Sequence, residues 1–96
     1  MHDKKKVEII VEAVYINRLL KLFQKYEIYG YTIIEDIKGS GGHGLKTADD
    51  VSNILSNSYI FFVCQEKTYL NMKDSIVEFI KKYGGKCFVS DITQLI

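Results

Sequence analysis

Tyr59 to Cys64, near the middle of the chain, form an almost continuous apolar and aromatic run. A run of this length predicts a central β-strand that is buried on both faces. Helices of the same chain can cover one face of such a strand, but the other face needs a second apolar cover. This requirement limits the folds that are open to a chain of only 96 residues.

The residues before this run predict a strand, a helix and a second strand. Val7 to Val11 form a β-rich run with alternate apolar side chains on one face. Apolar residues then recur at the spacing of one helix face: Ile16, Leu19, Leu20 and Phe23. The helix is predicted to end near Tyr29, because Gly30 is a residue type that terminates helices easily. Tyr31 to Ile37 return to β-branched chemistry.

The residues after the central run predict one more helix and one more strand. Apolar residues again recur at helical spacing: Tyr69, Met72, Ile76, Phe79, Ile80 and Tyr83. Gly84 and Gly85 supply the end of this helix, and Lys86 to Ile92 form the last strand. The order βαββαβ predicts one α+β domain over residues 1–96, with a ferredoxin-like, four-stranded antiparallel sheet and both helices on one face.

The second face of this sheet is predicted to be partly apolar. Four side chains are expected to point there at least in part: Ile10, Ile34, Phe62 and Phe88. In a chain of this size the simplest cover is another subunit, so we expect a homo-oligomer with the sheets packed inward.

Composition excludes several classes of protein. The formal net charge is +1, from 13 basic and 12 acidic residues, which argues against a nucleic-acid partner. No apolar run approaches the roughly 18 residues of a membrane span, and residues 1–6 are too polar for a signal peptide. We therefore expect a cytoplasmic protein that does not insert into membranes.

Catalytic and metal-binding chemistry is not predicted. Cys64 and Cys87 both lie in apolar runs, which indicates buried, reduced thiols and not a disulfide framework or a zinc site. The sequence offers no nucleophile–base pair, no carboxylate dyad on an ordered element and no cofactor fingerprint. The chain is therefore not expected to be an enzyme.

A long glycine-rich loop is predicted between the second and third strands, over residues 39–58 or thereabouts. Loops of this length in a compact domain are functional or disordered. Its first glycines allow successive N–H groups to converge on an anion, although the spacing is not that of a Walker loop. A flexible linker explains the same glycines. A second Gly-Lys site follows at Gly84-Gly85-Lys86, where a helix end with a solvated lysine is the simpler interpretation.

Two segments together resemble the PII signalling proteins. GYTIIEDIKGSGGHG, starting at Gly30, is similar to the second strand and loop start of that family, whose pattern is roughly G-x-T-V-x-x-V-K-G-x-G. GGKCFVSD, starting at Gly84, is similar to its glycine turn and final strand. The resemblance implies a non-enzymatic homotrimer that binds adenine nucleotides (AMP, ADP, ATP or cyclic AMP) in clefts between subunits.

The resemblance also implies which residues form each cleft. Thr32 would lie near the base, the start of the loop beside the phosphates, and the glycine turn of the neighbouring subunit against the phosphates. The nucleotide-binding residues implied in this way are Thr32, Lys38, Gly39, Gly41, Gly42, Gly84, Gly85 and Lys86. Gly42 and His43 stand where typical members carry Arg and Gln, so the usual arrangement of Mg²⁺ and ATP is left open.

The loop would carry the regulatory function. The resemblance implies that it docks on a membrane transporter, such as one for bicarbonate, or on a metabolic enzyme. The residues expected to contact the partner are His43, Leu45, Lys46, Val51 and Ile54. A divalent-cation-binding trimer of the CutA type is the alternative, since it shares the ferredoxin-like subunit. The identity of the partner, the preferred nucleotide and the role of bicarbonate stay open.

Overall fold

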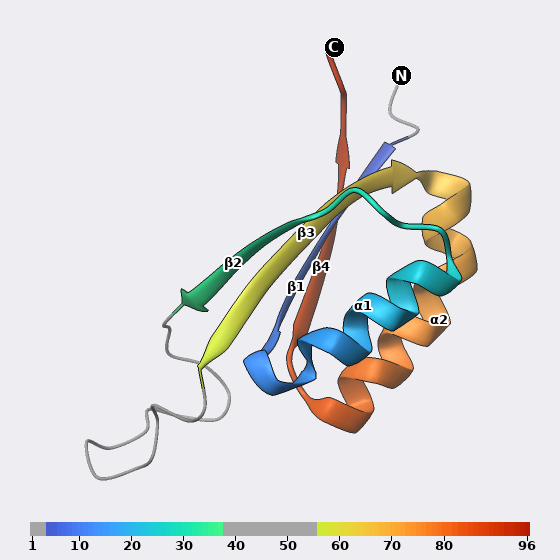
Figure 1. Ribbon diagram of the computed structural model, residues 1–96. Helices are drawn as coiled ribbons and strands as arrows, with labels where there is room; N and C mark the ends of the chain where they lie inside the picture. Colours follow the sequence, from blue (N-terminus) through green and yellow to red (C-terminus); the bar gives the residue numbers. More distant parts are fainter. Residues whose placement is uncertain (1–3, 38–55) are drawn as a thin grey trace, which may run out of the picture.

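The computed structural model describes residues 4–37 and 56–96, and these form a βαββαβ unit (Figure 1). The elements are β1 (Lys4–Glu12), a short 3-10 helix η1 (Ala13–Tyr15), α1 (Ile16–Lys25), β2 (Thr32–Ile37), β3 (Asn57–Gln65), α2 (Glu66–Tyr83) and β4 (Lys86–Ile92). The order of elements predicted from the sequence is confirmed.

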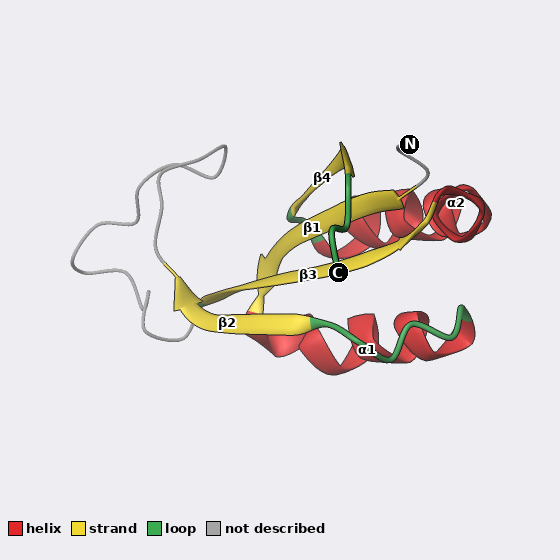
Figure 2. Ribbon diagram, turned by 90° about the horizontal axis from the view of Figure 1, so that it is seen from above, coloured by secondary structure: helices red, strands yellow, loops and turns green. Residues whose placement is uncertain are grey.

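The four strands form one antiparallel sheet in the order β2-β3-β1-β4, which Figure 2 shows from above. Both helices lie on the same side of this sheet (Figure 1). The two βαβ halves therefore interleave, with β1 and β3 in the centre and β2 and β4 at the edges. This arrangement is the α+β ferredoxin-like fold that the sequence predicts.

The core lies between the sheet and the helix layer. Val7 pairs with Phe62 and Ile9 pairs with Ile60 across β1 and β3, and all four side chains are fully buried or nearly so. The helices add buried apolar side chains to the same layer: Leu19, Phe23, Met72, Ile76 and Phe79. Alternation along the strands thus fixes which face receives the helices.

The other face of the sheet is bare within the chain and partly apolar. Ile34 and Phe88 are 50% and 54% exposed on this face, and Ile10 is half-buried, as predicted. Phe62 was assigned to this face wrongly, because its pairing with Val7 places it under the helices, where it is 1% exposed. Phe61 points to the bare face instead.

The end of α1 differs from the prediction. The helix ends at Lys25, four residues before the predicted end near Tyr29. Glu27 takes a left-handed conformation with φ 59°, its N–H donates to the Gln24 carbonyl at 3.0 Å, and the Ile28 N–H donates to the Phe23 carbonyl at 2.9 Å. These two bonds form a Schellman motif that buries Ile28 against the core. A glutamate occupies the position that glycine usually takes.

The beginning of β3 also differs from the prediction. The strand starts at Asn57, so Asn57 and Ser58 belong to the sheet and not to the loop that was predicted to reach residue 58. Their partners on β1 are Glu12 and Val11, and the Ala13 N–H donates to the Ser56 carbonyl at 2.8 Å just beyond them.

Across residues 4–37 and 56–96, neither helix is long and apolar enough to span a membrane.

The Schellman motif generates a prediction about stability. We expect Glu27→Gly to raise the free energy of unfolding by about 0.5–1 kcal/mol, because removing the Cβ relieves roughly 1–2 kcal/mol of left-handed strain while glycine costs extra backbone entropy. Glu78→Gly, at an exposed position within α2, is the control and should lower it by about 1 kcal/mol. Urea unfolding measures both variants, and an equal loss in both would contradict the strained position of Glu27.

Candidate functional site

The turn between α2 and β4 requires both of its glycines. Gly84 has φ 84° and its N–H donates to the Ile80 carbonyl at 2.8 Å, which closes the last turn of α2. Gly85 has φ 112°, and a Cβ at this position would lie 2.4 Å from the carbonyl oxygen of Ile10. The glycine turn is therefore fixed by a close approach of β4 to β1. The fold alone explains the two glycines, but not Lys86.

Lys86 and Thr32 are the two predicted site residues with side chains that the structure describes. Lys86 is exposed at the first position of β4 and pairs with Ile10, on the bare face of the sheet. Thr32 is exposed at the first position of β2 and pairs with Phe61, also on the bare face. The two residues share a face but lie on opposite edge strands.

One chain does not bring these edges together. β2 and β4 are separated by β3 and β1, which corresponds to about 14 Å at the usual strand spacing of about 4.8 Å. Yet β2 ends and β4 begins at the same end of the sheet. The last residue of β2, Ile37, pairs with Asn57, which in turn pairs with Glu12 of β1. Glu12 is only two residues along β1 from Ile10, the partner of Lys86. Figure 1 shows both points toward the lower end of the sheet.

The remaining predicted site residues lie outside the described part of the chain. These are Lys38, Gly39, Gly41, Gly42, His43, Leu45, Lys46, Val51 and Ile54. Their roles in nucleotide and partner binding stay predictions.

Sequence analysis missed two cations beside the glycine turn. Arg18 Nη1 donates to the hydroxyl of Tyr83 at 3.4 Å, and its guanidinium lies 5.4 Å from the centre of the Tyr83 ring. Lys82 Nζ lies 5.3 Å from the centre of the same ring. Tyr83 directly precedes Gly84, so positive charge gathers next to the turn. Only the packing of α1 against the end of α2 reveals this, since Arg18 is 65 residues away in sequence.

A charged pair lies within the bare face of the sheet. Lys6 Nζ is 3.7 Å from Glu8 Oε1 and 4.7 Å from the centre of the Phe61 ring. Burial, together with the charge of Glu8 and a hydrogen bond to it, raises the pKa of Tyr59. The Lys6 and Glu8 side chains are only 33% and 30% exposed. Lys6, Glu8 and Tyr59 therefore have polar partners among themselves, which lowers the cost of burying these three groups further.

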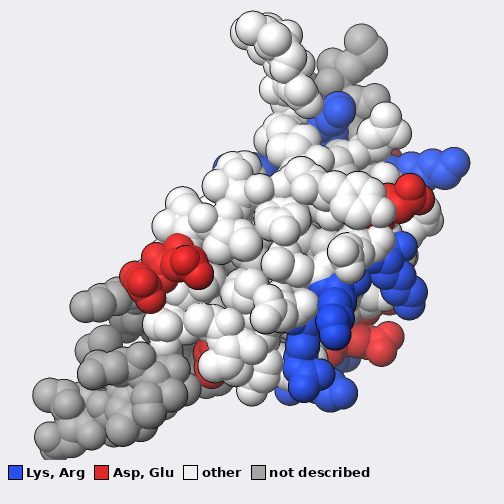
Figure 3. Space-filling view, in the orientation of Figure 1, with Lys and Arg blue, Asp and Glu red and all other residues white. Residues whose placement is uncertain are grey.

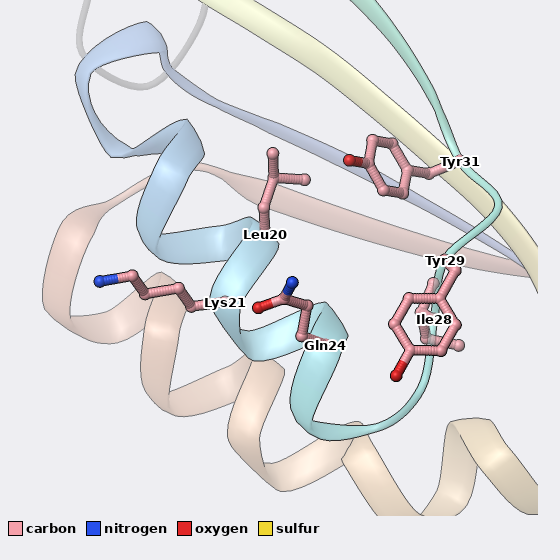
Figure 4. A pocket seen from close by; sticks show the side chains of 6 residues that line it. All are labelled: Leu20, Lys21, Gln24, Ile28, Tyr29 and Tyr31. Atoms are coloured by element: carbon pink, nitrogen blue, oxygen red, sulfur yellow. The ribbon is translucent and has the colours of Figure 1, made fainter.

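The hollow shown in Figure 4 is not formed by the predicted nucleotide residues. It holds about 200 Å³ between α1 and the segment that leads to β2. Leu20 and Gln24 face it from the helix, Tyr29 and Tyr31 face it from the opposite side, and Lys21 points away from the two tyrosines. This hollow is therefore not the predicted nucleotide site. A nucleotide site that is completed by a second subunit would not form a hollow within one chain.

The two cysteines agree with the sequence analysis. Cys64 is buried and Cys87 half-buried, and both are free thiols. Burial raises the pKa of Cys64, and burial together with the charge of Glu8 raises the pKa of Cys87 to about 11. Among residues 4–37 and 56–96, no three His, Cys, Asp or Glu side chains are grouped to hold a metal ion.

These features define a ferredoxin-like protein with a candidate site at one end of its sheet. A family model described as nitrogen regulatory protein P-II matches residues 4–96. The chain belongs to this family, which confirms the resemblance in the two glycine-containing segments. A search of curated proteins found no match.

Solved structures of PII-like proteins share the fold. CPII, a nitrogen regulatory PII-like protein from Thiomonas intermedia K12 bound to ADP, AMP and bicarbonate, superposes with a TM-score of 0.77 at 25% identity, covering 97% of this chain and 96% of that one. A PII-like signalling protein from Thermus thermophilus gives 0.71 at 21% identity, over 93% and 86%. Arabidopsis thaliana PII bound to citrate gives 0.62 at 18% identity, over 96% and 79%. The last two show the fold alone.

The close approach at the glycine turn generates a second prediction. We expect Gly85→Ala to lower the free energy of unfolding by at least about 1–3 kcal/mol, because alanine at φ 112° is strained and its Cβ meets the Ile10 carbonyl. Gly30→Ala is the matched control, since a Cβ there meets nothing within 4 Å, and it should be nearly neutral. Urea unfolding of both variants decides. Equal stabilities would contradict the described geometry of the turn.

Proposed function

We propose that this protein is a non-enzymatic regulator that binds adenine nucleotides between the subunits of a homotrimer. The observation that carries the proposal is the position of the two glycine-containing segments. β2, which precedes the first segment's glycines, ends at the end of the sheet where Lys86 begins β4, but on the opposite edge. In a ring of subunits the two edges of neighbouring sheets meet, and each junction then combines Thr32 and the start of the loop from one subunit with Lys86 from the next.

The bare face of the sheet supports the trimer. Ile34, Phe88 and Val63 are 50%, 54% and 37% exposed there, and burying apolar surface of this kind favours association. A ring with the bare faces turned inward covers all of them at once. It also leaves the helix layer and the loop side accessible to a partner.

The chemistry of the junction suits an anionic ligand with an aromatic part. Lys86 offers an ammonium group on an exposed strand end, and charge-assisted hydrogen bonds to phosphate oxygens are among the strong ones. On the other edge, Thr32 lies opposite Phe61, whose ring is 5.9 Å from that of Tyr59. A base packed on these rings near the Thr32 hydroxyl would match the ADP and AMP bound by CPII.

The regulatory output is proposed to run through the loop that follows β2, as the family resemblance implies. The nucleotide would set the conformation of the loop, and the loop would dock on a membrane transporter or a metabolic enzyme. Bicarbonate accompanies ADP and AMP in CPII, so it is a candidate second ligand. The cytoplasmic location remains a prediction.

Calorimetric titration tests the proposal most directly. We expect heat from at least one of AMP, ADP, ATP and cyclic AMP, measured with and without Mg²⁺ and bicarbonate. Lys86→Ala should weaken binding by about 1.5–3 kcal/mol, through loss of a charged hydrogen bond to phosphate. Lys67→Ala, an exposed lysine at the other end of α2, is the control and should leave the affinity unchanged.

Two outcomes would contradict the proposal. The absence of heat with every nucleotide would remove adenine nucleotides as ligands. Equal affinities of the wild-type protein and the Lys86→Ala variant would remove Lys86 from the site.

A further inference from the structure

The hollow between α1 and the segment that leads to β2 takes no part in the proposed nucleotide site. It holds about 200 Å³ and is lined by six residues: Leu20, Lys21, Gln24, Ile28, Tyr29 and Tyr31. Figure 4 shows α1 as one of its walls and the two tyrosines on the other. A cavity of roughly 150 Å³ already binds benzene, so this hollow is large enough for a small ring with a polar substituent.

The wall opposite α1 is held in place by the fold. The Schellman motif after α1 turns the chain back toward the helix, and Ile28 is buried against the core. Tyr31 packs edge-on against the buried ring of Phe23, with 5.9 Å between the ring centres. A hollow with fixed walls loses little conformational entropy when a ligand binds.

Tyr29 is the exposed part of this wall. Its side chain is 69% exposed. Among the described residues its ring contacts no other aromatic ring, and its hydroxyl forms no hydrogen bond. The fold therefore does not account for an aromatic residue at this position. An aromatic ligand in the hollow would remove the exposed ring from water and gain the additional attraction between two rings.

The charges around the hollow favour an anion over a cation. Among the described residues no carboxylate lines it. The helix α1 carries Arg18, Lys21 and Lys25 but no acidic residue, and Figure 3 shows basic side chains gathered over the helices. Within residues 4–37 and 56–96, none of these three cations has an ion pair. A negatively charged group at the margin of the hollow is therefore attracted, and a positively charged one is repelled.

Two side chains of α1 can bind the polar part of a ligand. Gln24 faces the hollow, and its amide can both donate and accept a hydrogen bond. The Lys21 ammonium points away from the two tyrosines in Figure 4. Its side chain is exposed and has a flexible four-carbon stem, so the ammonium can turn toward a carboxylate at the margin.

We propose that this hollow binds a small aromatic carboxylate. The ring of the ligand lies between Tyr29 and Leu20, and its carboxylate lies beside Lys21 and Gln24. An alicyclic acid would lose the attraction between rings, and an aromatic cation would be repelled by the lysine. The lining thus selects for both parts of the ligand together.

The proposed carboxylate site is separate from the proposed nucleotide site. Tyr31 lies on the helix side of the sheet, where it contacts Phe23, whereas Thr32 pairs with Phe61 on the bare face. All six lining residues belong to one chain, so the hollow does not need a second subunit. The inference therefore goes beyond the proposed function and does not depend on it.

Titration of isotope-labelled protein, followed by NMR, tests the site with benzoate as the probe. We expect the largest shifts within residues 20–31 and a dissociation constant on the order of 1 mM, as for a ligand of this size in an open hollow. Cyclohexanecarboxylate has the charge without the aromatic ring, and benzylammonium has the ring with the opposite charge. Each should bind about fivefold more weakly than benzoate, or less tightly still.

Variants of the lining separate the ring contact from the charge contact. Tyr29→Ala should weaken benzoate binding about tenfold, because it removes the ring that packs on the ligand. Lys21→Glu should reverse the charge preference, so that benzylammonium binds more tightly than benzoate.

Two matched controls accompany these variants. Lys25→Glu makes the same charge change one turn further along α1, outside the hollow, and Leu70→Ala removes an apolar side chain of α2 that is 57% exposed. Both should keep the preference for benzoate. Circular dichroism confirms that each variant is folded. If a variant does not fold, Tyr29→Leu and Lys21→Gln replace it, each with a smaller expected effect.

Each outcome decides for or against the carboxylate site. Tenfold weaker binding by Tyr29→Ala together with reversed charge preference in Lys21→Glu supports it. The absence of shifts at ten times the expected dissociation constant would overturn it, and so would equal binding of benzoate and cyclohexanecarboxylate. Displacement of benzoate by ADP would also overturn it, because the two ligands would then share one site. Benzoate binding by a protein that binds no adenine nucleotide supports the carboxylate site and overturns the proposed nucleotide function.

Discussion

The structure depends on a sheet that is apolar on both faces but covered by helices on only one. On one side both helices pack on side chains that are fully buried or nearly so: Val7, Ile9, Ile60 and Phe62. On the other side Ile34, Val63 and Phe88 remain exposed around the Lys6–Glu8 pair. The helix layer and the bare face both follow from this arrangement. A chain of this size has no further element among its described residues to cover the second face.

The glycine turn shows how a motif can serve the fold and the site together. Gly85 is required because β4 passes within reach of the Ile10 carbonyl, so its presence says little about a ligand. Lys86 has no such structural role, since its side chain is exposed on the bare face. Arg18 and Lys82, held on the ring of Tyr83, add positive charge next to the same turn. The lysine and its neighbours, not the glycines, carry the argument for an anionic ligand.

The order of the elements could be predicted because the hydrophobic periodicity of helices and strands can be read from the sequence alone. The prediction failed where one residue of register decides the outcome, as when Phe62 was assigned to the bare face and Phe61 was not. It placed the end of α1 too late because it expected a glycine at the left-handed position that Glu27 occupies. The cations beside the glycine turn were missed as a group, because Arg18 on α1 meets Tyr83 at the end of α2 only after folding.

Native mass spectrometry with ADP tests the central claim, that each site is completed by a second subunit. The account predicts that ADP is carried by the trimer alone, with up to one ADP for each subunit, and that monomers released by dilution are free of ADP. A monomer that retains ADP would show a site complete within one chain. That result would contradict the account.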